Sequence, residues 1–553
     1  MNDPVNFMTP QDTSIHDPLN RWQGCPIFSW GFGGHIVTMF PTRTQRNAVG
    51  MSQPMIKCSP GEVKVRHTRD ILPLEDSLVK FPGPVYSGGK GAKLKKKEVL
   101  AWMAEKIAAL EGDASGAGMF LPGEPIPDET ERKRKEEKIL LWKGMKMFLE
   151  NDGNIEGFIG KSIRAFLWPE DSSPTSADSF SLVASMSSSA TGSGLGPVPD
   201  RVNMEAMKTI RTHLLNGDRT AAVWHAVDKR LWSHAMLIAG TVSNDLWKQV
   251  VQDFVKNEVK TLGGGLESLA VLYEIFGGNG EESVDELVPQ SARLGQPMMT
   301  SMTGTVSAKD PLEGLEKWRE TLALIMSNRS AGDTTAITAL GKLLGTYARV
   351  EAAHLCYLFA KNAASFSGSD DPNTAVALFG ADHVYSPFTF WKDTDAILLS
   401  EVYELALSLA PGPTPPAIIP HLQGIKVFHA FLLAESGYGT EAHKYCDAIG
   451  SVLKTSTKPL PYFHRTMFNA LEELTNRVSQ SPSAAAAGGW LSKPSLDNIS
   501  GSMWGAFTKF VAGEDSEPGP GTDNGQAAGV LAQGPFGGTS TSPGMSRTQS
   551  IAD

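Results

Sequence analysis

Residues 27 to 39 read IFSWGFGGHIVTM, a segment with the composition of a β-hairpin. Aromatic and β-branched residues, which favour strands, lie on both sides of Gly33 and Gly34, and two adjacent glycines suit a two-residue turn. Such a turn would group Phe28, Trp30, Phe32, His35, Val37 and Met39 on one face and Ile27, Ile36 and Phe40 on the other. Both faces of the hairpin would therefore carry large apolar side chains.

A short third strand is predicted at residues 63 to 67 (VKVRH), which would extend the hairpin to a three-stranded sheet. A small sheet with two apolar faces is only marginally stable in water. Either the chain's own helices or a second protein must cover it.

The rest of the chain has helical periodicity, interrupted by segments rich in Gly, Pro, Ser and charge. We expect an N-terminal β unit at residues 1–80, a helical block at 93–478 and a low-complexity tail at 479–553. Within the helical block, disordered insertions are predicted near residues 112–129, 170–199 and 277–309.

A weak internal repeat indicates how the helices pack. Its copies are HLLNGDRTAAVWHAV from His213, KLLGTYARVEAAHLCYLFA from Lys342 and FLLAESGYGTEAHKYCDAI from Phe431. Each pairs the end of one helix with a glycine turn and an alanine-rich second helix, as in a helical hairpin. Stacked hairpins form an α-solenoid, and the uneven spacing predicts an irregular one that folds back on itself.

Charge and cysteine content exclude several classes of protein. The chain of 553 residues has 50 basic and 60 acidic side chains and a net charge of -10, which argues against a broad nucleic-acid-binding surface. Its four cysteines are widely spaced, so no disulfide framework or CxxC zinc site is predicted, and a reducing compartment fits best. The first residues lack a signal-peptide pattern, and no stretch reaches eighteen apolar residues, so any membrane association should be peripheral.

No motif predicts catalysis, a metal site or a cofactor. Gly160, Lys161 and Ser162 lack the glycine that a phosphate-binding loop requires five residues before Gly160, where Ile155 stands. His354 with Cys356, and His443 with Cys446, could bind a metal, but their similar places in two repeats favour packing in the core. HExxH and GxSxG motifs are absent from the sequence.

Two further segments could contact a membrane or a partner. The basic runs at residues 93–98 (KLKKKE) and 131–138 (ERKRKEEK) are interpreted as solvated helix faces, and the first is the better candidate for an acidic membrane surface. An apolar island at 490–513 has a helical stripe that could dock on the solenoid or bind a partner or membrane; its contact residues would be Met503, Trp504, Phe507 and Phe510.

A hairpin followed by an irregular helical stack resembles the ancestral coatomer element of vesicle coats and nuclear pores. More specifically, residues 16–41 (HDPLNRWQGCPIFSWGFGGHIVTMFP) resemble the start of the central conserved region of the Sec16 family, which assembles COPII coats at endoplasmic-reticulum exit sites. AVWHAVDKRLWSHAMLIAG, YARVEAAHLCYLFA, YGTEAHKYCDAIG and GAFTKFVAGED resemble the rest of that region. The resemblance covers most of residues 15 to 515, and proteins of this family are much longer.

The resemblance implies that the three-stranded sheet is a β-blade, inserted as the seventh blade into the six-bladed WD-repeat propeller of Sec13. We expect the partner-binding residues to be Ile27, Phe28, Trp30, Phe32, Gly33, Gly34, His35, Val37, Met39, Val63 and Val65. It also implies a homodimer through the helices, association with the inner-coat subunit Sec23, regulation of the coat's small GTPase, and no cofactor.

The expected function is that of a non-enzymatic scaffold, peripheral to the cytosolic face of the endoplasmic reticulum, which promotes the formation of vesicles bound for the Golgi. An outer-coat leg or a nucleoporin of the same architecture is the alternative within this class. A solenoid-bearing enzyme or GTPase regulator is the alternative from another class.

Overall fold

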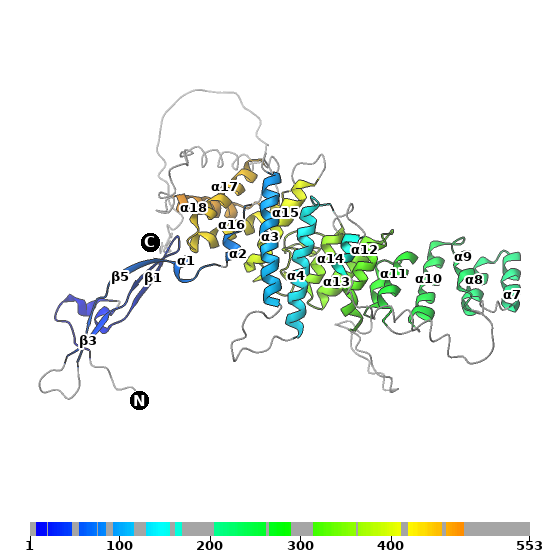
Figure 1. Cartoon of the computed structure of the whole chain (residues 1–553), viewed down its shortest axis with the longest axis horizontal. Coiled ribbons are helices and arrows are strands. Elements are labelled where there is room, and N and C mark those ends of the chain that lie inside the picture. The colour runs from blue at the N-terminus through cyan, green and yellow to red at the C-terminus, as the bar shows by residue number, and fades with distance from the viewer. Residues whose placement is uncertain are drawn as a thin grey trace, which may run out of the picture. The chain divides into compact units, whose positions relative to one another are not determined.

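The computed structural model describes residues 7–18, 20–46, 55–74, 76–84, 92–114, 129–154, 161–168, 204–260, 265–288, 313–360, 363–410, 418–455 and 461–479. Contacts divide the chain into two compact units, Met1–Ser492 and Lys493–Asp553, and every described residue belongs to the first. The described residues are mainly helical, with five short strands near the N-terminus (Figure 1).

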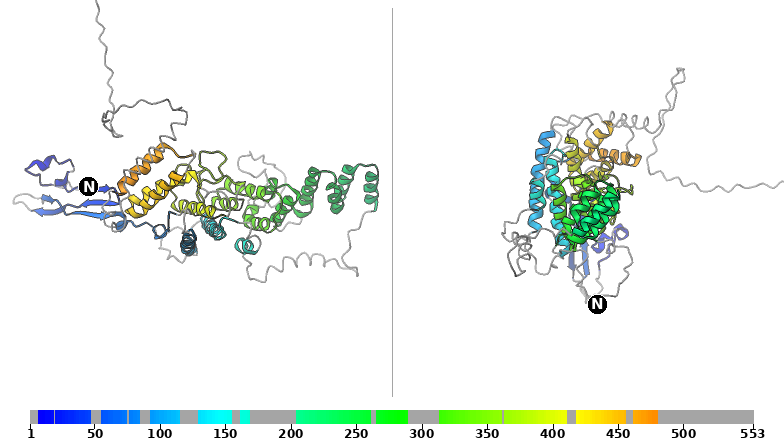
Figure 2. Two further views of the ribbon diagram at one scale, coloured as in Figure 1. Left: turned by 90° about the horizontal axis from the view of Figure 1, so that it is seen from above. Right: turned by 90° about the vertical axis from the view of Figure 1, so that its right-hand side faces the viewer.

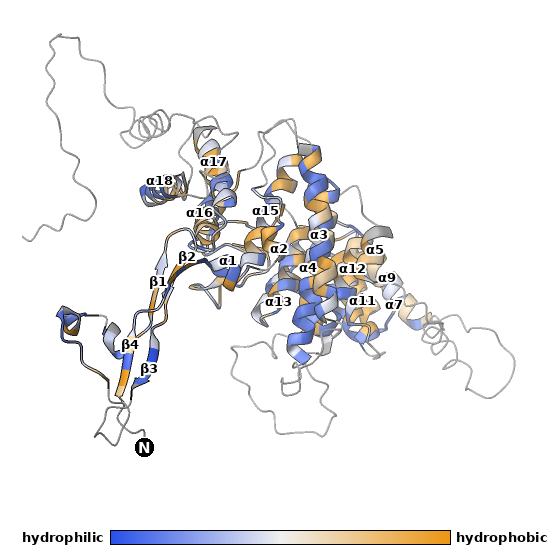
Figure 3. Cartoon of the chain, turned by 60° about the vertical axis from the view of Figure 1, so that its left-hand side comes forward, coloured by the Kyte–Doolittle hydropathy of each residue, from blue (hydrophilic) through white to orange (hydrophobic). Residues whose placement is uncertain are grey.

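Three of the strands form the predicted antiparallel sheet. Strands β1 (Ile27–Gly31), β2 (His35–Met39) and β5 (Val63–His67) pair in the order β1-β2-β5, which confirms both the hairpin and its third strand. Figure 3 shows apolar colour along β1 and β2. Two 3-10 turns, η1 (Thr13–His16) and η2 (Arg21–Gln23), precede the sheet, and two short helices, α1 (Thr68–Ile71) and α2 (Asp76–Val79), follow it.

The turn of the hairpin has three residues, so the predicted two-residue turn was wrong. Gly31 pairs with His35 and encloses residues 32–34, in which Gly33 and Gly34 have φ of 77° and 72°. Shifting a strand register by one residue moves every side chain to the opposite face. The predicted faces were therefore also wrong: Phe28 and Trp30 lie with their pairing partners Thr38 and Ile36, while Ile27 lies with Met39.

A second hairpin was not predicted. Strands β3 (Thr42–Arg46) and β4 (Met55–Ser59) pair antiparallel, and the Thr44 hydroxyl donates to the carbonyl of Lys57 at 3.2 Å. The sequence TRTQR has no apolar alternation, which is the pattern that reveals strands with one buried face.

The helical part begins with α3 (Ala92–Ala114), α4 (Glu129–Glu150) and α5 (Lys161–Leu167). The elements that follow are α7 (Met204–Leu215), α8 (Arg219–Asp228), α9 (Trp232–Ala239), α10 (Asn244–Phe254), the π-helical η5 (Val255–Val259), α11 (Glu267–Gly277), η7 (Glu282–Glu286), η9 (Glu313–Lys317), α12 (Trp318–Ser327), α13 (Asp333–Thr346), α14 (Val350–Ala360), η11 (Phe390–Lys392), α15 (Thr394–Leu409), α16 (Pro420–Glu435), α17 (Gly439–Thr455) and α18 (Arg465–Ser479). The three repeat copies coincide with the hairpins α7–α8, α13–α14 and α16–α17, as predicted.

The solenoid folds back on itself, as expected. From α7 to α14 each helix contacts the next, but α14 then packs against α4, and α5 packs against α12. Helix α4 also contacts α15, so early helices lie beside helices much later in the sequence. In both views of Figure 2 the cyan helices lie against green and yellow ones.

The largest apolar cluster joins α3, α4 and α5 to α11–α15 and includes the fully buried Trp142 and Met103. Helices α16–α18 form a separate cluster, against which Phe32 and Leu74 of the N-terminal segment pack. The predicted insertion at 277–309 begins too early, because Leu287 and Val288 are buried in the larger cluster. Three predicted segments lie outside the described residues: 289–309, the insertion at 170–199, and the C-terminal island with Met503, Trp504, Phe507 and Phe510.

Candidate partner-binding surface

Both faces of the β1-β2-β5 sheet expose large apolar side chains. Phe28 and Trp30 are 55% and 59% exposed and make an edge-to-face ring contact at 5.3 Å. Val63 and Val65 are 63% and 64% exposed, and the register places them on the opposite face. Contiguous exposed apolar surface of this kind is typical of interaction sites.

The central strand is buried between these side chains. Ile36 is 1% exposed and Met39 4%, although the two residues point to opposite faces of the sheet. Ile27, Val37 and His35 are half-buried, and the His35 ring lies 4.3 Å from that of His67. Of the residues predicted to bind a partner, Phe28, Trp30, Val63 and Val65 are thus the most exposed.

The edges of the sheet are also suited to binding. β1 and β5 are its two outer strands, so each presents one row of backbone N–H and C=O groups away from β2. Such edges can pair with strands of another chain. The sheet thus combines two apolar faces with two edges capable of hydrogen bonding.

The turn residues contact the helical part of the chain. The Arg477 guanidinium lies 5.4 Å from the centre of the Phe32 ring, and Phe32 packs on the cluster of α16–α18. Within the N-terminal segment, the Thr68 backbone and hydroxyl also donate to the Gly34 carbonyl at 2.6 and 2.9 Å. Phe32, Gly33 and Gly34, which were predicted to bind a partner, lie in a turn that contacts the chain's own helices.

Two residues of the helical part that contact this turn, Gly437 and Arg477, were not identified from the sequence. Gly437 lies between α16 and α17 with φ of 91°, at the turn of the third repeat copy. Its left-handed conformation explains the glycine at this position of the third copy. No sequence pattern connects it with a hairpin about 400 residues earlier, because the contact exists only after folding.

Most residues of the two basic runs are exposed on helix faces, as predicted, but three of their side chains are also ion-paired. Lys96 lies 2.7 Å from Asp152, Arg134 lies 2.9 Å from Glu351, and Lys138 lies 2.8 Å from Asp395. Burial raises the pKa of the Asp395 carboxyl, whereas the nearby Lys138 and Lys106 lower it. The two lysines outweigh the burial, so this pKa lies below its usual range. The first pair joins α3 to the turn after α4, and the other two join α4 to α14 and α15.

Of the candidate metal ligands, His354, Cys356 and Cys446 are buried, whereas His443 is partly exposed. His354 is buried and its Nδ1 accepts the Gly380 N–H at 2.9 Å; burial lowers its pKa to about 3. Cys356 and Cys446 are buried, and burial raises the pKa of both thiols. His443 is half-exposed and lies 3.0 Å from Asp447, so the packing interpretation is wrong for this histidine.

The described residues contain no group of three or more His, Cys, Asp or Glu side chains that could hold a metal ion. Lys161 begins α5, whereas the glycine before it lies outside the described ranges. Within those ranges, no helix has both the length and the apolar composition that crossing a bilayer requires.

Comparison with known proteins gives two family matches. Residues 25–153 match the model described as "Vesicle coat trafficking protein Sec16 mid-region", and residues 210–514 match "Sec16 Sec23-binding domain". The second match extends over the C-terminal island.

Curated relatives agree with these matches. The chain is 44% identical over 552 residues to the COPII coat assembly protein sec16 of Aspergillus niger, covering 99% of this chain and 28% of that protein. It is 43% identical to SEC16 of Phaeosphaeria nodorum, covering 99% and 30%. The chain therefore spans less than a third of the length of these relatives.

One solved structure shares the fold. The structure titled "Sec13/Sec16 complex, S.cerevisiae" aligns with a TM-score of 0.52 at 20% sequence identity, covering 82% of this chain and 99% of that chain. Because the second family model alone matches more than half of the sequence, the chain belongs to the Sec16 family.

Proposed function

We propose that this chain is a non-enzymatic scaffold for COPII coat assembly, and that its β1-β2-β5 sheet completes the WD-repeat propeller of Sec13. The observation that carries the proposal is the exposure of Phe28 and Trp30 on one face and of Val63 and Val65 on the other. A sheet that packs on a single neighbour needs one apolar face. A propeller blade needs two, because a blade lies on each side of it.

The energetics require both faces. Burying one large apolar side chain contributes about 1.5–3 kcal/mol, so two such residues contribute roughly 3–6 kcal/mol. Association costs about 4–15 kcal/mol in lost freedom of motion, so burial of one face alone leaves little or no net stabilisation. Hydrogen bonds along the outer edges of β1 and β5 would add to the burial and set the register.

The relatives support the cellular role. Proteins 43–44% identical over nearly the whole chain are named for COPII coat assembly, which favours an exit-site scaffold over an outer-coat leg or a nucleoporin. The chain would then act at the cytosolic face of the endoplasmic reticulum as a peripheral protein. The name of the second family model supports an inner-coat partner, Sec23, for residues 210–514, and the helices would also mediate homodimerisation.

The test is complex formation with purified Sec13. The intact chain should co-elute with Sec13 at equal stoichiometry, and deletion of residues 1–80 should abolish the complex. Trp30→Asp would bury an unpaired charge in the interface, at a cost of several kcal/mol, and should weaken binding by about a hundredfold or more. Helical content by circular dichroism should not change, because Trp30 is exposed in the chain alone.

Leu237→Asp is the matched control, because Leu237 is 75% exposed and lies on α9. Its affinity for Sec13 should equal that of the unmodified chain. If the deletion variant retained Sec13, the sheet would not be the binding element. Robust GTP hydrolysis by the pure chain, or stimulation of a GTPase, would instead support the enzymatic or regulatory alternative.

A further inference from the structure

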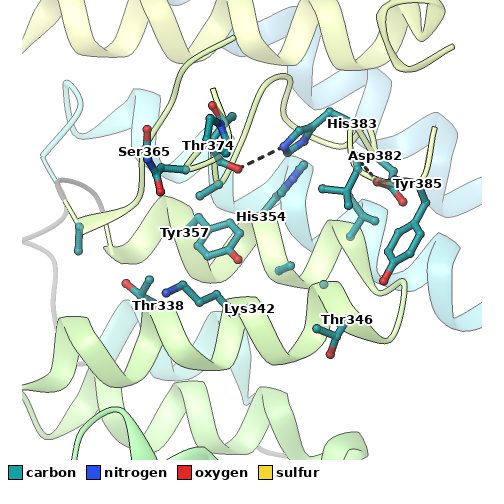
Figure 4. A pocket seen from close by; sticks show the side chains of 18 residues that line it. Thr338, Lys342, Thr346, His354, Tyr357, Ser365, Thr374, Asp382, His383 and Tyr385 are labelled. Carbon is teal, nitrogen blue, oxygen red and sulfur yellow. Dashed lines mark hydrogen bonds between the residues drawn. The ribbon is translucent and has the colours of Figure 1, made fainter. Parts of the chain in front are cut away.

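A cavity of about 640 Å³ opens beside α13 and α14, far along the sequence from the β sheet. Figure 4 shows Lys342, His354 and Tyr357 rising from these helices, with Thr374, Asp382, His383 and Tyr385 opposite them on the segment before α15. The volume is within the range of about 300–1,000 Å³ that ligand sites occupy. It is large enough for a few residues of a peptide.

Two buried side chains offer hydrogen-bond donors to this cavity. The Nδ1 atom of His354 accepts the Gly380 N–H, so the proton of the neutral ring is on Nε2. Tyr357 carries a hydroxyl that is protonated at neutral pH, and burial raises its pKa further above the ordinary value. Among the described residues, neither His354 Nε2 nor the Tyr357 hydroxyl has a protein hydrogen-bond partner, although both side chains are largely buried. A ligand rich in acceptor atoms would satisfy both.

The charges around the cavity favour an acidic ligand. Asp382 accepts hydrogen bonds from the N–H groups of Val384 and Tyr385, both at 2.9 Å. Its Oδ1 atom is therefore engaged by the backbone of its own segment. The pKa of Arg134 is raised mainly by Glu351, and Asp393 and Asp382 add to this effect. Lys342, exposed at the cavity, has no carboxylate partner among the described residues.

The same cavity has an apolar part. Val350, Ala353 and the Tyr357 ring line it from α14, and the exposed Val384 and Tyr385 line it from the opposite segment. These groups could enclose one apolar side chain placed next to a carboxylate.

We propose that this cavity binds a short acidic peptide segment of a partner protein. One carboxylate pairs with Lys342, one apolar side chain packs between Tyr357 and Val384, and peptide carbonyls accept hydrogen bonds from His354 and Tyr357. The site is separate from the β sheet, so it is independent of binding to Sec13.

A display library of random octapeptides, panned against the intact chain, tests the proposal without a known ligand. Enriched peptides should contain Asp or Glu next to an aromatic or aliphatic residue. Their affinities, measured by fluorescence anisotropy, should fall about tenfold or more in Lys342→Glu, because a charge-assisted hydrogen bond is lost and repulsion is added. Tyr357→Phe, which removes only the hydroxyl, should weaken binding by about three- to tenfold.

Lys444→Glu makes the same change of charge at an exposed position on α17 and should leave the affinity unchanged. Circular dichroism and binding to Sec13 should be normal in all three variants. The proposal is overturned if no peptide is enriched, if the enriched peptides are basic or neutral, or if Lys342→Glu and Lys444→Glu weaken binding equally.

Discussion

Gly34 and Gly437 meet so closely that a Cβ atom at Gly34 would lie 2.6 Å from the backbone nitrogen of Gly437. Gly34 is in the turn of the β1–β2 hairpin, and Gly437 is in the turn between α16 and α17. Both have a positive φ, 72° and 91°. This backbone contact attaches the proposed Sec13-binding sheet to the helical part.

The first prediction concerns this contact. Gly34→Ala should detach the hairpin turn from α17, because its Cβ would overlap the Gly437 backbone, which cannot move aside. Hydrogen exchange should become faster in β2 and β5, while the helical circular dichroism stays the same. Gly217→Ala is the control: Gly217 has a similar φ of 76° but open space around its Cβ position, so it should cost only the conformational strain of about 1 kcal/mol. Equal effects of the two substitutions would contradict the packing explanation.

The second prediction tests whether both faces of the sheet are covered in the complex. Val63→Asp should weaken binding to Sec13 as Trp30→Asp does, since their side chains lie on opposite faces and both are exposed in the chain alone. Isothermal titration with Sec13 would measure both. Loss of binding in one variant only would mean that the partner covers a single face, which is inconsistent with a propeller blade.

The third prediction concerns a buried charge cluster. Burial lowers the pKa of Lys426, whereas the nearby carboxylates of Glu404 and Glu401 raise it. The carboxylates outweigh the burial, so the pKa of Lys426 is raised. Glu404 also accepts the Ile419 N–H and the Gln423 amide, both at 2.9 Å, and Glu401 accepts the Tyr445 hydroxyl at 3.0 Å. Lys426→Met would leave two buried carboxylates without their cation and should destabilise α15–α17 by about 3–5 kcal/mol.

Urea unfolding, followed by circular dichroism, would measure this loss. The exposed Lys444→Met should change stability by less than about 0.5 kcal/mol. Adding Glu401→Gln and Glu404→Gln to Lys426→Met should restore part of the stability. A destabilisation that persists unchanged in the triple variant would point to lost packing by the lysine stem rather than to charge.

The fourth prediction concerns pH. Glu274 is buried on α11; burial raises the pKa of its carboxyl to about 7, against the opposing effect of the Asn279 amide, which donates to it at 2.7 Å. Because the folded state holds this proton more tightly than the unfolded state, its contribution to stability is present below pH 4.5 and is lost as pH rises through about 7.

Glu274→Gln keeps an oxygen for the Asn279 amide and removes the titration. The variant should therefore melt at a higher temperature than the unmodified chain at pH 8, by the equivalent of about 1–2 kcal/mol, and the difference should shrink toward pH 5. Thermal melting at several pH values would show this. A difference that does not depend on pH would mean that Glu274 does not titrate in this range.

Local signals in the sequence predicted the elements that local physics controls. The strands around Gly33 and Gly34, the third strand at Val63–His67 and the helical hairpins of the three repeat copies all formed, because strand composition and helical periodicity act over a few neighbouring residues. The exposed apolar faces of the sheet also followed from its composition.

Other features depended on contacts between distant residues. The three-residue turn places Phe28 and Trp30 on the same face as Ile36. Lys138 pairs with Asp395, which lies on a helix more than 250 residues later. Sequence alone established that this chain carries an apolar sheet on a helical stack, because composition and periodicity are local properties. Only the tertiary structure decided which residues of that sheet are buried, which remain exposed, and that Gly34 rests on Gly437, because packing joins segments that no sequence pattern relates.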